Sequence, residues 1–152
     1  MENKRKPIIL VFTDSLGLPR DVPELVSYEE TYIYKLRQHY LDYEIVSVSI
    51  GGADIITLQG QIFYYKNCKP KYVIVQAGIV DCAPRALTQV ESAILNSNML
   101  LRKVSKKVLK PFLPYLRKKR KKTTTPISVF SHYVELIYNS FSDTNFYWIK
   151  IC

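Results

Sequence analysis

The apolar residues of the chain gather in four short runs of strand length. The runs are rich in isoleucine, valine and aromatic residues, and the first three are followed within two residues by aspartate or glycine, which is typical of β-strands. The run at 8–12 is apolar throughout, as in a central strand covered on both faces. The pattern predicts strands at 8–12, 43–50, 72–76 and 146–152.

Helical spacing of apolar residues follows the first strand. Ser27, with Glu30 three residues later, has the pattern of a capping box and predicts a helix that begins there and ends near Tyr40. Its predicted buried stripe consists of Tyr32, Ile33, Leu36 and Tyr40.

Three more helices are predicted, at 54–66, 88–109 and 126–140. Pro111 and Pro114 are expected to end the second of these, whereas Thr125 as cap and Pro126 as first residue begin the last. Strands that alternate with helices form βαβ units. The sequence therefore predicts an α/β fold, a doubly wound parallel sheet of about four strands in three layers, α/β/α.

Polar and glycine-containing turns follow the first three predicted strands. They are Asp14-Ser15, Gly51-Gly52, and the stretch from Gly78 to Asp81. Parallel strands bring their carboxyl ends to one edge of the sheet, where ligands bind in such folds. A serine in a tight turn can present its hydroxyl, and glycines let backbone N–H groups approach a substrate oxyanion.

The order of these turns resembles the SGNH (GDSL-type) hydrolase family, with its flavodoxin-like fold, in which Asp-Ser, a glycine and Gly-x-Asn-Asp follow successive strands. The resemblance covers nearly the whole chain and implies a serine ester hydrolase, with an O-acetyl group on a carbohydrate as a candidate substrate. It makes Ser15 the nucleophile and the N–H groups of Ser15 and Gly52 the oxyanion donors. Asp14 and Asp81 would order their turns, and Gly78 matches the first residue of the third block.

Two features depart from that family. Val80 stands where the family has an asparagine, and a valine side chain cannot donate a hydrogen bond to an oxyanion. No Asp-x-x-His, the block that supplies the family's base, occurs in the chain, and its histidines, His39 and His132, fall within predicted helices. We therefore expect residues 1–152 to form a single domain that is C-terminally incomplete and lacks its general base.

Each turn residue also has an ordinary structural interpretation. Ser15 would then cap the segment that follows it, and Gly51-Gly52 would be a simple turn at a strand end. Asp81 would cap a helix or bind Arg85. It is the combination of the three turns, in order on a βαβ framework, that favours the family resemblance.

The charge of the chain is concentrated in one segment. The 152 residues are 47% hydrophobic and 23% charged, which indicates one globular domain, and carry a net charge of +9. Eleven lysines and arginines lie from Arg102 to Lys122, and no acidic residue occurs between Glu91 and Glu135. The remainder has a charge of −2. We interpret 102–122 as a basic insertion.

Three interpretations of this insertion remain open. Its cations alternate with apolar residues, which favours attachment to an anionic membrane surface over phosphate binding on a nucleic acid. A solvated loop is the third. The same membrane attachment supports an alternative function, a non-catalytic binding or scaffold domain that keeps the SGNH-like fold.

The cysteines and the known binding motifs indicate the cellular location and the cofactor requirement. Cys68, Cys82 and Cys152 are odd in number and widely spaced, which argues against disulfides and a zinc site and favours the cytoplasm, with peripheral attachment at the inner face of the membrane. No nucleotide-binding motif occurs, so we predict no cofactor and no metal. The open edge of the fourth strand predicts an oligomer or a partner chain that covers it.

Overall fold

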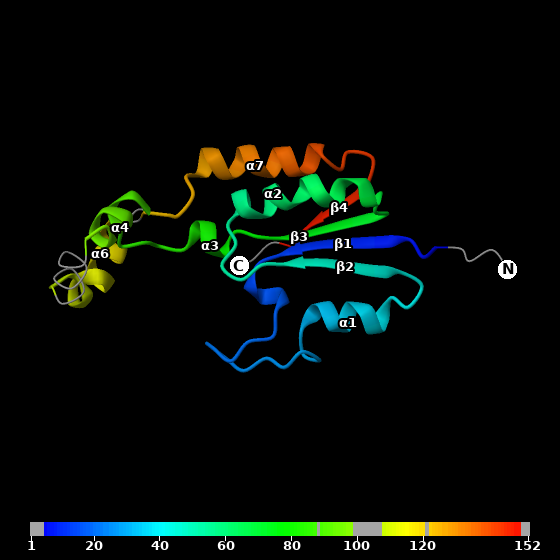
Figure 1. Cartoon of the computed structure of the whole chain (residues 1–152), viewed down its shortest axis with the longest axis horizontal. Helices are drawn as coiled ribbons and strands as arrows, with labels where there is room; N and C mark the ends of the chain where they lie inside the picture. The colour runs from blue at the N-terminus through cyan, green and yellow to red at the C-terminus, as the bar shows by residue number, and fades with distance from the viewer. Residues whose placement is uncertain (1–4, 88, 99–107, 121, 150–152) are drawn as a thin grey trace. The chain divides into compact units, whose positions relative to one another are not determined.

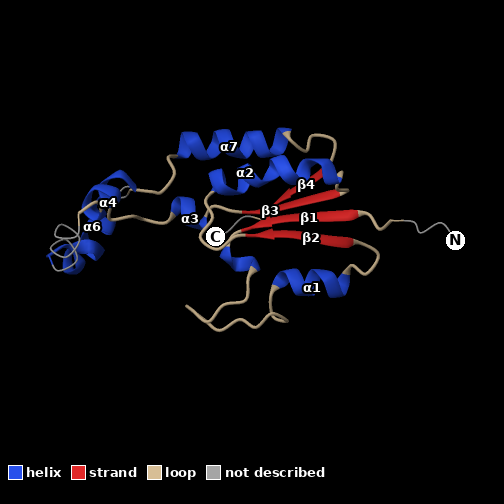
Figure 2. Cartoon of the chain, in the orientation of Figure 1, coloured by secondary structure: helices blue, strands red, loops and turns tan. Residues whose placement is uncertain are grey.

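The central element of the fold is a parallel four-stranded sheet (Figures 1 and 2). The computed structural model of the chain describes residues 5–87, 89–98, 108–120 and 122–149. Its strands are β1 (Ile8–Thr13), β2 (Glu44–Ser49), β3 (Tyr72–Gln76) and β4 (Asn145–Trp148), in the order β2-β1-β3-β4. All neighbouring pairs are parallel. The predicted strands at 8–12, 43–50 and 72–76 and the parallel sheet are confirmed. The fourth strand ends at Trp148 and not at the predicted 152, and 150–152 lie outside the described residues.

Helices cover both faces of the sheet, as predicted for a doubly wound fold. Helices α2 (Ile55–Tyr65) and α7 (Ile127–Asn139) lie on one face, and α1 (Tyr32–His39) lies on the other (Figure 1). Alternation along β1 sends Leu10 and Phe12 to the α2 and α7 side and Ile9 and Val11 to the α1 side. The core on the α2 and α7 side is the larger of the two.

The first helix begins later than the sequence predicted. Half of the capping box forms, because the Ser27 N–H donates to Glu30 Oε2 at 2.8 Å. The residues after Ser27 nevertheless form turns, and Thr31 is the N-cap, its hydroxyl accepting from the Tyr34 N–H at 3.2 Å. The predicted stripe is only partly buried: Ile33 is buried, but Tyr40 follows the last helical residue and is 41% exposed.

Prolines and threonines at the later helix ends also act differently from the prediction. Thr125 does not cap α7, because its hydroxyl donates to the Asp81 carboxylate, and the helix begins at Ile127. Pro114 lies in the first turn of α6 (Leu113–Arg120), where a missing N–H costs no helical hydrogen bond. Within the predicted helix 88–109, α4 spans Gln89–Asn96, and 99–107 lie outside the described residues.

The chain divides into two compact units. The first comprises Met1–Ile79 and Ile127–Cys152 and contains the sheet with α1, α2 and α7. The second, Val80–Pro126, contains α4, the short helix η3 (Lys110–Phe112) and α6, and the described part of the basic insertion falls within it. Among the described residues, no helix has the length and apolar character needed to cross a membrane.

Candidate functional site

The turn after β1 presents a serine that is held in place by a buried carboxylate. Asp14 is 1% exposed, and its Oδ1 accepts a hydrogen bond of 2.9 Å from the Leu16 N–H. This contact caps the single-turn helix η1 (Ser15–Gly17), whose last N–H donates to the Asp14 carbonyl at 3.3 Å. Ser15 is exposed. The local sequence therefore positions Ser15 at the carboxyl end of β1.

The turn after β2 packs against the one after β1. The Ile50 N–H donates to the Thr13 carbonyl at 3.0 Å and continues the pairing past the strand ends. At Gly17, a Cβ would lie 2.3 Å from Thr13 Cγ2 and 2.9 Å from Ser49 Oγ, so only glycine fits. Gly52 is exposed and has a φ of 72°, in the left-handed region that glycine tolerates.

The turn after β3 also depends on a glycine. Gly78 has a φ of 122°, which side-chain-bearing residues rarely adopt. A Cβ at this position would lie 3.7 Å from the Phe130 ring of α7. The structure thus brings Asp14, Ser15, Gly52 and Gly78 to the carboxyl ends of three neighbouring strands, as the parallel topology predicted.

Asp81 belongs to the second unit. It lies in the short helix α3 (Ile79–Cys82) and is 1% exposed. Its Oδ1 accepts a hydrogen bond from the Thr125 hydroxyl at 2.5 Å, and its carbonyl accepts from the N–H groups of Thr124 and Thr125 at 3.0 and 3.4 Å. These contacts fasten the segment that leads into α7. Val80, beside it, is half-buried.

A buried polar cluster beneath the serine turn was not identified from the sequence. The Thr13 hydroxyl donates to Gln76 Oε1 at 2.6 Å, and Gln76 Nε2 donates to Asp14 Oδ1 at 3.4 Å. Asp14 Oδ2 is buried and has no hydrogen-bond partner among the described residues. The signal in the sequence was Gln76, a single polar residue that ends an otherwise apolar strand.

Tyr32 extends this cluster from α1. Burial raises the pKa of its hydroxyl to about 12; the side-chain hydrogen bond with Thr13 opposes this rise, and the negative charge of Asp14 adds to it. The hydroxyl therefore stays protonated at neutral pH and can donate a hydrogen bond. It cannot act there as a base for Ser15.

Both histidines lie on helices, His39 in α1 and His132 in α7. Helix α1 carries the chain back to the start of β2, so His39, its last residue, lies toward the amino ends of the strands. His132 is exposed on α7, and its ring contacts Tyr133 at a centroid distance of 5.6 Å. In the described residues, the ring contacts of the two imidazoles are with their neighbours Tyr40 and Tyr133, and neither imidazole is hydrogen-bonded to Ser15.

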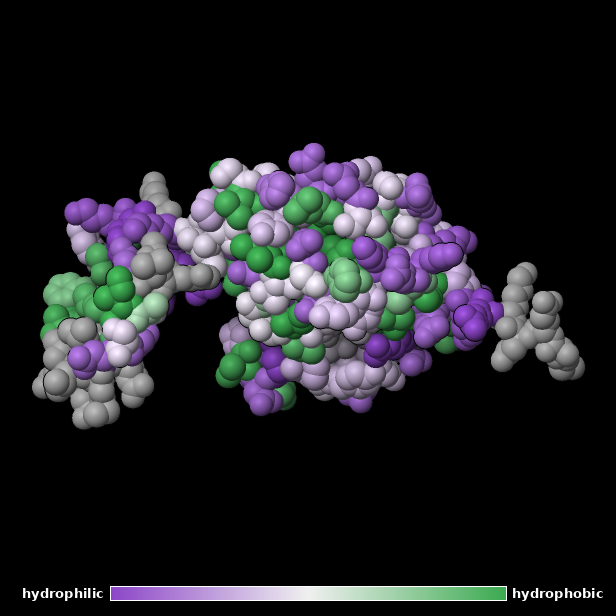
Figure 3. Space-filling model, turned by 45° about the horizontal axis from the view of Figure 1, so that its top comes forward, coloured by the Kyte–Doolittle hydropathy of each residue, from purple (hydrophilic) through white to green (hydrophobic). Residues whose placement is uncertain are grey.

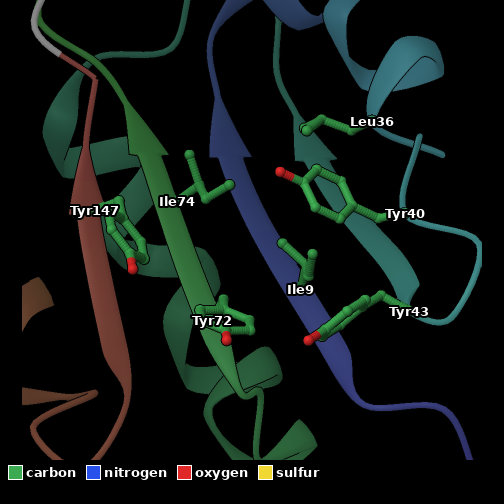
Figure 4. A pocket seen from close by; sticks show the side chains of 7 residues that line it. All are labelled: Ile9, Leu36, Tyr40, Tyr43, Tyr72, Ile74 and Tyr147. Carbon is green, nitrogen blue, oxygen red and sulfur yellow. The ribbon is translucent and has the colours of Figure 1, made fainter. Parts of the chain in front are cut away.

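An aromatic hollow lies on the sheet face beside α1 (Figure 4). It has a volume of about 430 Å³ and is lined by Ile9, Leu36, Tyr40, Tyr43, Tyr72, Ile74 and Tyr147. It forms because α1 packs against β2 and leaves outward-facing side chains of β3 and β4 uncovered. Lys71 Nζ lies 5.7 and 5.5 Å from the ring centroids of Tyr43 and Tyr72. This hollow was not identified from the sequence, and none of the strand-end site residues lines it.

Metal ligands do not gather in the part of the chain that the structure describes. Residues 5–87, 89–98, 108–120 and 122–149 contain no group of three histidine, cysteine, aspartate or glutamate side chains that could hold an ion. Cys68 and Cys82 are free thiols. Cys152 lies outside the described residues.

Comparison with known proteins yields similar solved structures. No protein-family model matches the sequence. No curated protein matches it either. AlinE4, an SGNH-hydrolase family esterase, is 17% identical over 93% of this chain and 75% of that protein, with a TM-score of 0.37. A mutant of Axe2, an acetyl-xylooligosaccharide esterase from Geobacillus Stearmophilus, is 16% identical over 99% of this chain and 78% of that protein, with a TM-score of 0.43.

The acetyl xylan esterase AlAXEase is 14% identical, and the match covers 91% of this chain and 75% of that protein, with a TM-score of 0.40. At these identities and scores the similarities assign no activity to this chain. The parallel α/β arrangement is visible in its own sheet and helices. The chain therefore has a parallel α/β fold, and the solved structures similar to it include SGNH-hydrolase esterases.

Proposed function

We propose that the chain is a serine ester hydrolase with Ser15 as its nucleophile and acts on small-molecule or glycan esters, with a carbohydrate O-acetyl group as the candidate substrate. The observation that carries the proposal is the exposed Ser15, held at the carboxyl end of a central parallel strand by the buried Asp14. Exposed Gly52, at a left-handed φ, supports a second backbone oxyanion donor there. Asp14, Gly78 and Asp81 shape the turns.

The proposed reaction has two steps. Ser15 Oγ bonds to the acyl carbon, its hydroxyl proton passes to a base, and the alcohol leaves with a proton as its bond to that carbon breaks. Water then attacks the acyl-serine, which releases the acid and restores the hydroxyl. During both steps the N–H groups of Ser15 and Gly52 stabilise the negative oxygen.

The base is the part of the reaction that the described residues do not supply. In the described residues neither imidazole is hydrogen-bonded to Ser15, and Tyr32 is held in its protonated form. We therefore propose that the base comes from outside the described residues. An added imidazole is small enough to serve in its place, which makes the proposal testable with this chain alone.

The test is acyl transfer from p-nitrophenyl acetate, with and without imidazole, followed by peptide mass mapping. Acetylation is expected on Ser15, at a level that rises with imidazole concentration. Ser131 provides the matched comparison because it is also an exposed serine of the first unit. Ser15→Ala should abolish the site-specific signal, and Ser131→Ala should leave it unchanged. Equal acetylation of Ser15 and Ser131 would remove Ser15 from the mechanism.

A second candidate function is a non-catalytic binding or scaffold domain at an anionic membrane. The basic, partly apolar surface of the second unit favours it. The two free thiols among the described residues fit a reducing compartment, so we place the protein in the cytoplasm, at the inner face of the membrane. The two functions differ in whether Ser15 reacts, which the acetylation experiment determines.

A further inference from the structure

Exposed apolar side chains lie beside cations on the second unit. Val108, Phe112 and Tyr115 are 56%, 57% and 58% exposed. They belong to the stretch that contains η3 and α6, and the last four residues of α6 are Arg117, Lys118, Lys119 and Arg120. Figure 3 shows hydrophobic surface next to strongly hydrophilic surface over this part of the chain. Residues 113–120 form a helix and not the loop of the third interpretation, although most of their side chains are exposed to solvent.

Helical spacing gathers the rings and some of the cations on one face. Phe112, Tyr115 and Lys119 stand three and then four residues apart, and Lys119 Nζ lies 5.6 Å from the Tyr115 ring centroid. Lys118 follows Tyr115 by three residues and is exposed. Leu113 and Leu116 are half-buried instead. The exposed face of Phe112, Tyr115, Lys118 and Lys119 is called the α6 face below.

The two carboxylates of this unit bind groups outside the α6 face. Val80–Pro126 contains twelve lysines and arginines but only two acidic residues, Asp81 and Glu91. Asp81 accepts from Thr125, and Glu91 binds the Arg120 guanidinium through both oxygens and Lys122 Nζ at 3.3 Å. Among the described residues, no carboxylate pairs with Lys118 or Lys119. The α6 face therefore presents uncompensated positive charge beside exposed rings.

An anionic lipid surface matches both properties of this face. Its headgroup charge attracts lysine and arginine, and its interfacial region accepts aromatic rings with their polar edge toward water. A nucleic-acid backbone would engage the cations but would leave Val108 and Phe112 exposed. We propose that the α6 face binds the surface of an anionic bilayer. The proposal deepens the second candidate function and does not depend on Ser15 chemistry.

The test is co-sedimentation of the full chain with vesicles of phosphatidylcholine alone and with vesicles in which about a third of the lipid is phosphatidylserine. Binding is expected to the anionic vesicles only. Lys118→Gln/Lys119→Gln should weaken it by about twenty-fivefold, since each cation near the surface contributes about fivefold. Phe112→Ala/Tyr115→Ala should weaken it at unchanged net charge.

Matched control variants come from the first unit. Phe63 and Tyr64 form an exposed aromatic pair on α2, at 71% and 70% exposure, and Lys35 and Lys66 are exposed cations. Phe63→Ala/Tyr64→Ala and Lys35→Gln/Lys66→Gln are expected to change binding less than twofold each. Equal losses in the control and α6-face variants would overturn the proposal, because attraction would then follow total charge or total aromatic surface.

Two further measurements separate the lipid from other partners. Tyr115→Trp should retain binding and shift its fluorescence to shorter wavelength on anionic vesicles, because the indole enters the interface. Duplex DNA serves as a competing polyanion. Binding to neutral and anionic vesicles alike, or DNA binding that exceeds vesicle binding and is unaffected by Phe112→Ala/Tyr115→Ala, would overturn the proposal. Acetylation of Ser15 is expected to be the same in all these variants.

Discussion

Gly17 provides the sharpest test of how the Ser15 turn is built. In Gly17→Ala the new Cβ would stand 2.3 Å from Thr13 Cγ2 and 2.9 Å from Ser49 Oγ. Thr13 is fully buried in the central strand, and its hydroxyl is bound to Gln76. The methyl group therefore cannot move away freely, and the strain must be taken up by the turns after β1 and β2.

The expected cost follows from overpacking of a buried site. Added methyl groups in well-packed regions lower the free energy of unfolding by about 1–3 kcal/mol. For a chain of this size, 1 kcal/mol corresponds to about 2–4 °C in the midpoint of thermal unfolding, so a decrease of about 2–12 °C is expected. Because η1 carries Ser15, imidazole-dependent acetylation of Ser15 should fall in the same variant.

A double variant tests the cause directly. Thr13→Ser removes the atom that the new methyl group would meet and retains the hydroxyl that binds Gln76. In Gly17→Ala/Thr13→Ser, the destabilisation should be smaller than the sum of the single effects by about 0.5 kcal/mol or more. The control is Gly60→Ala, in the interior of α2 with no atom within 4 Å of the added Cβ, which should stabilise the protein by about 0.5–1 kcal/mol.

Urea unfolding followed by the fluorescence of the single tryptophan, Trp148, measures these free energies. Trp148 lies in β4 and packs against the larger core, so its emission reports on the sheet. Equal stability of Gly17→Ala and Gly60→Ala, or single effects that simply add in the double variant, would refute the close packing of the two turns.

Three further predictions concern Gly52, Tyr32 and Thr125. Gly52→Ala should lower the free energy of unfolding in urea by about 1–2 kcal/mol, because Gly52 has a left-handed φ of 72°. Gly51→Ala should lower it by less than about 0.5 kcal/mol, and equal decreases for the two variants would contradict this explanation. The Tyr32 pKa is raised to about 12 from about 10, so the folded state holds this proton more tightly, and its stabilising effect should be complete below pH 10 and lost as the pH rises to about 12. Tyr32→Phe should therefore flatten the alkaline loss of stability by up to about 2–3 kcal/mol, and an unchanged profile would argue against burial of this hydroxyl. Thr125→Val removes a donor to the buried Asp81 carboxylate and should lower the free energy of unfolding in urea by about 1.5–3 kcal/mol, and an unchanged value would contradict this contact.

Local sequence patterns predicted the strands of the sheet and the site residues that directly follow them. The β-branched runs at 8–12 and 72–76 form β1 and β3, because burial on both faces of a parallel sheet requires continuous apolar sequence. Asp54 is the N-cap of α2, and its Oδ1 accepts a hydrogen bond from the Thr57 N–H at 2.8 Å. Asp14, Ser15, Gly52 and Gly78 lie at strand ends because each follows its strand directly along the chain.

Helix starts were less predictable, since several polar residues compete to cap the same turn. Ser27 and Thr31 both have suitable side chains, and the choice of Thr31 depends on its burial against the rest of the fold. Thr125 is drawn away from α7 by Asp81, forty-four residues earlier in the chain. Such preferences arise from contacts between distant residues, which a local pattern does not contain.

The sequence by itself determined where the strands lie, that they are parallel, and that Ser15 follows the central strand. Only the tertiary structure decided what surrounds that serine: register places Thr13 beside Gln76, and Gln76 reaches the carboxylate of Asp14. It also decided that Asp81 makes its contacts in the second unit and that Phe112 and Tyr115 remain exposed. The physical reason is that hydrophobic periodicity and turn chemistry act over a few residues. Hydrogen-bond partners and burial depend on which distant segments the fold brings together.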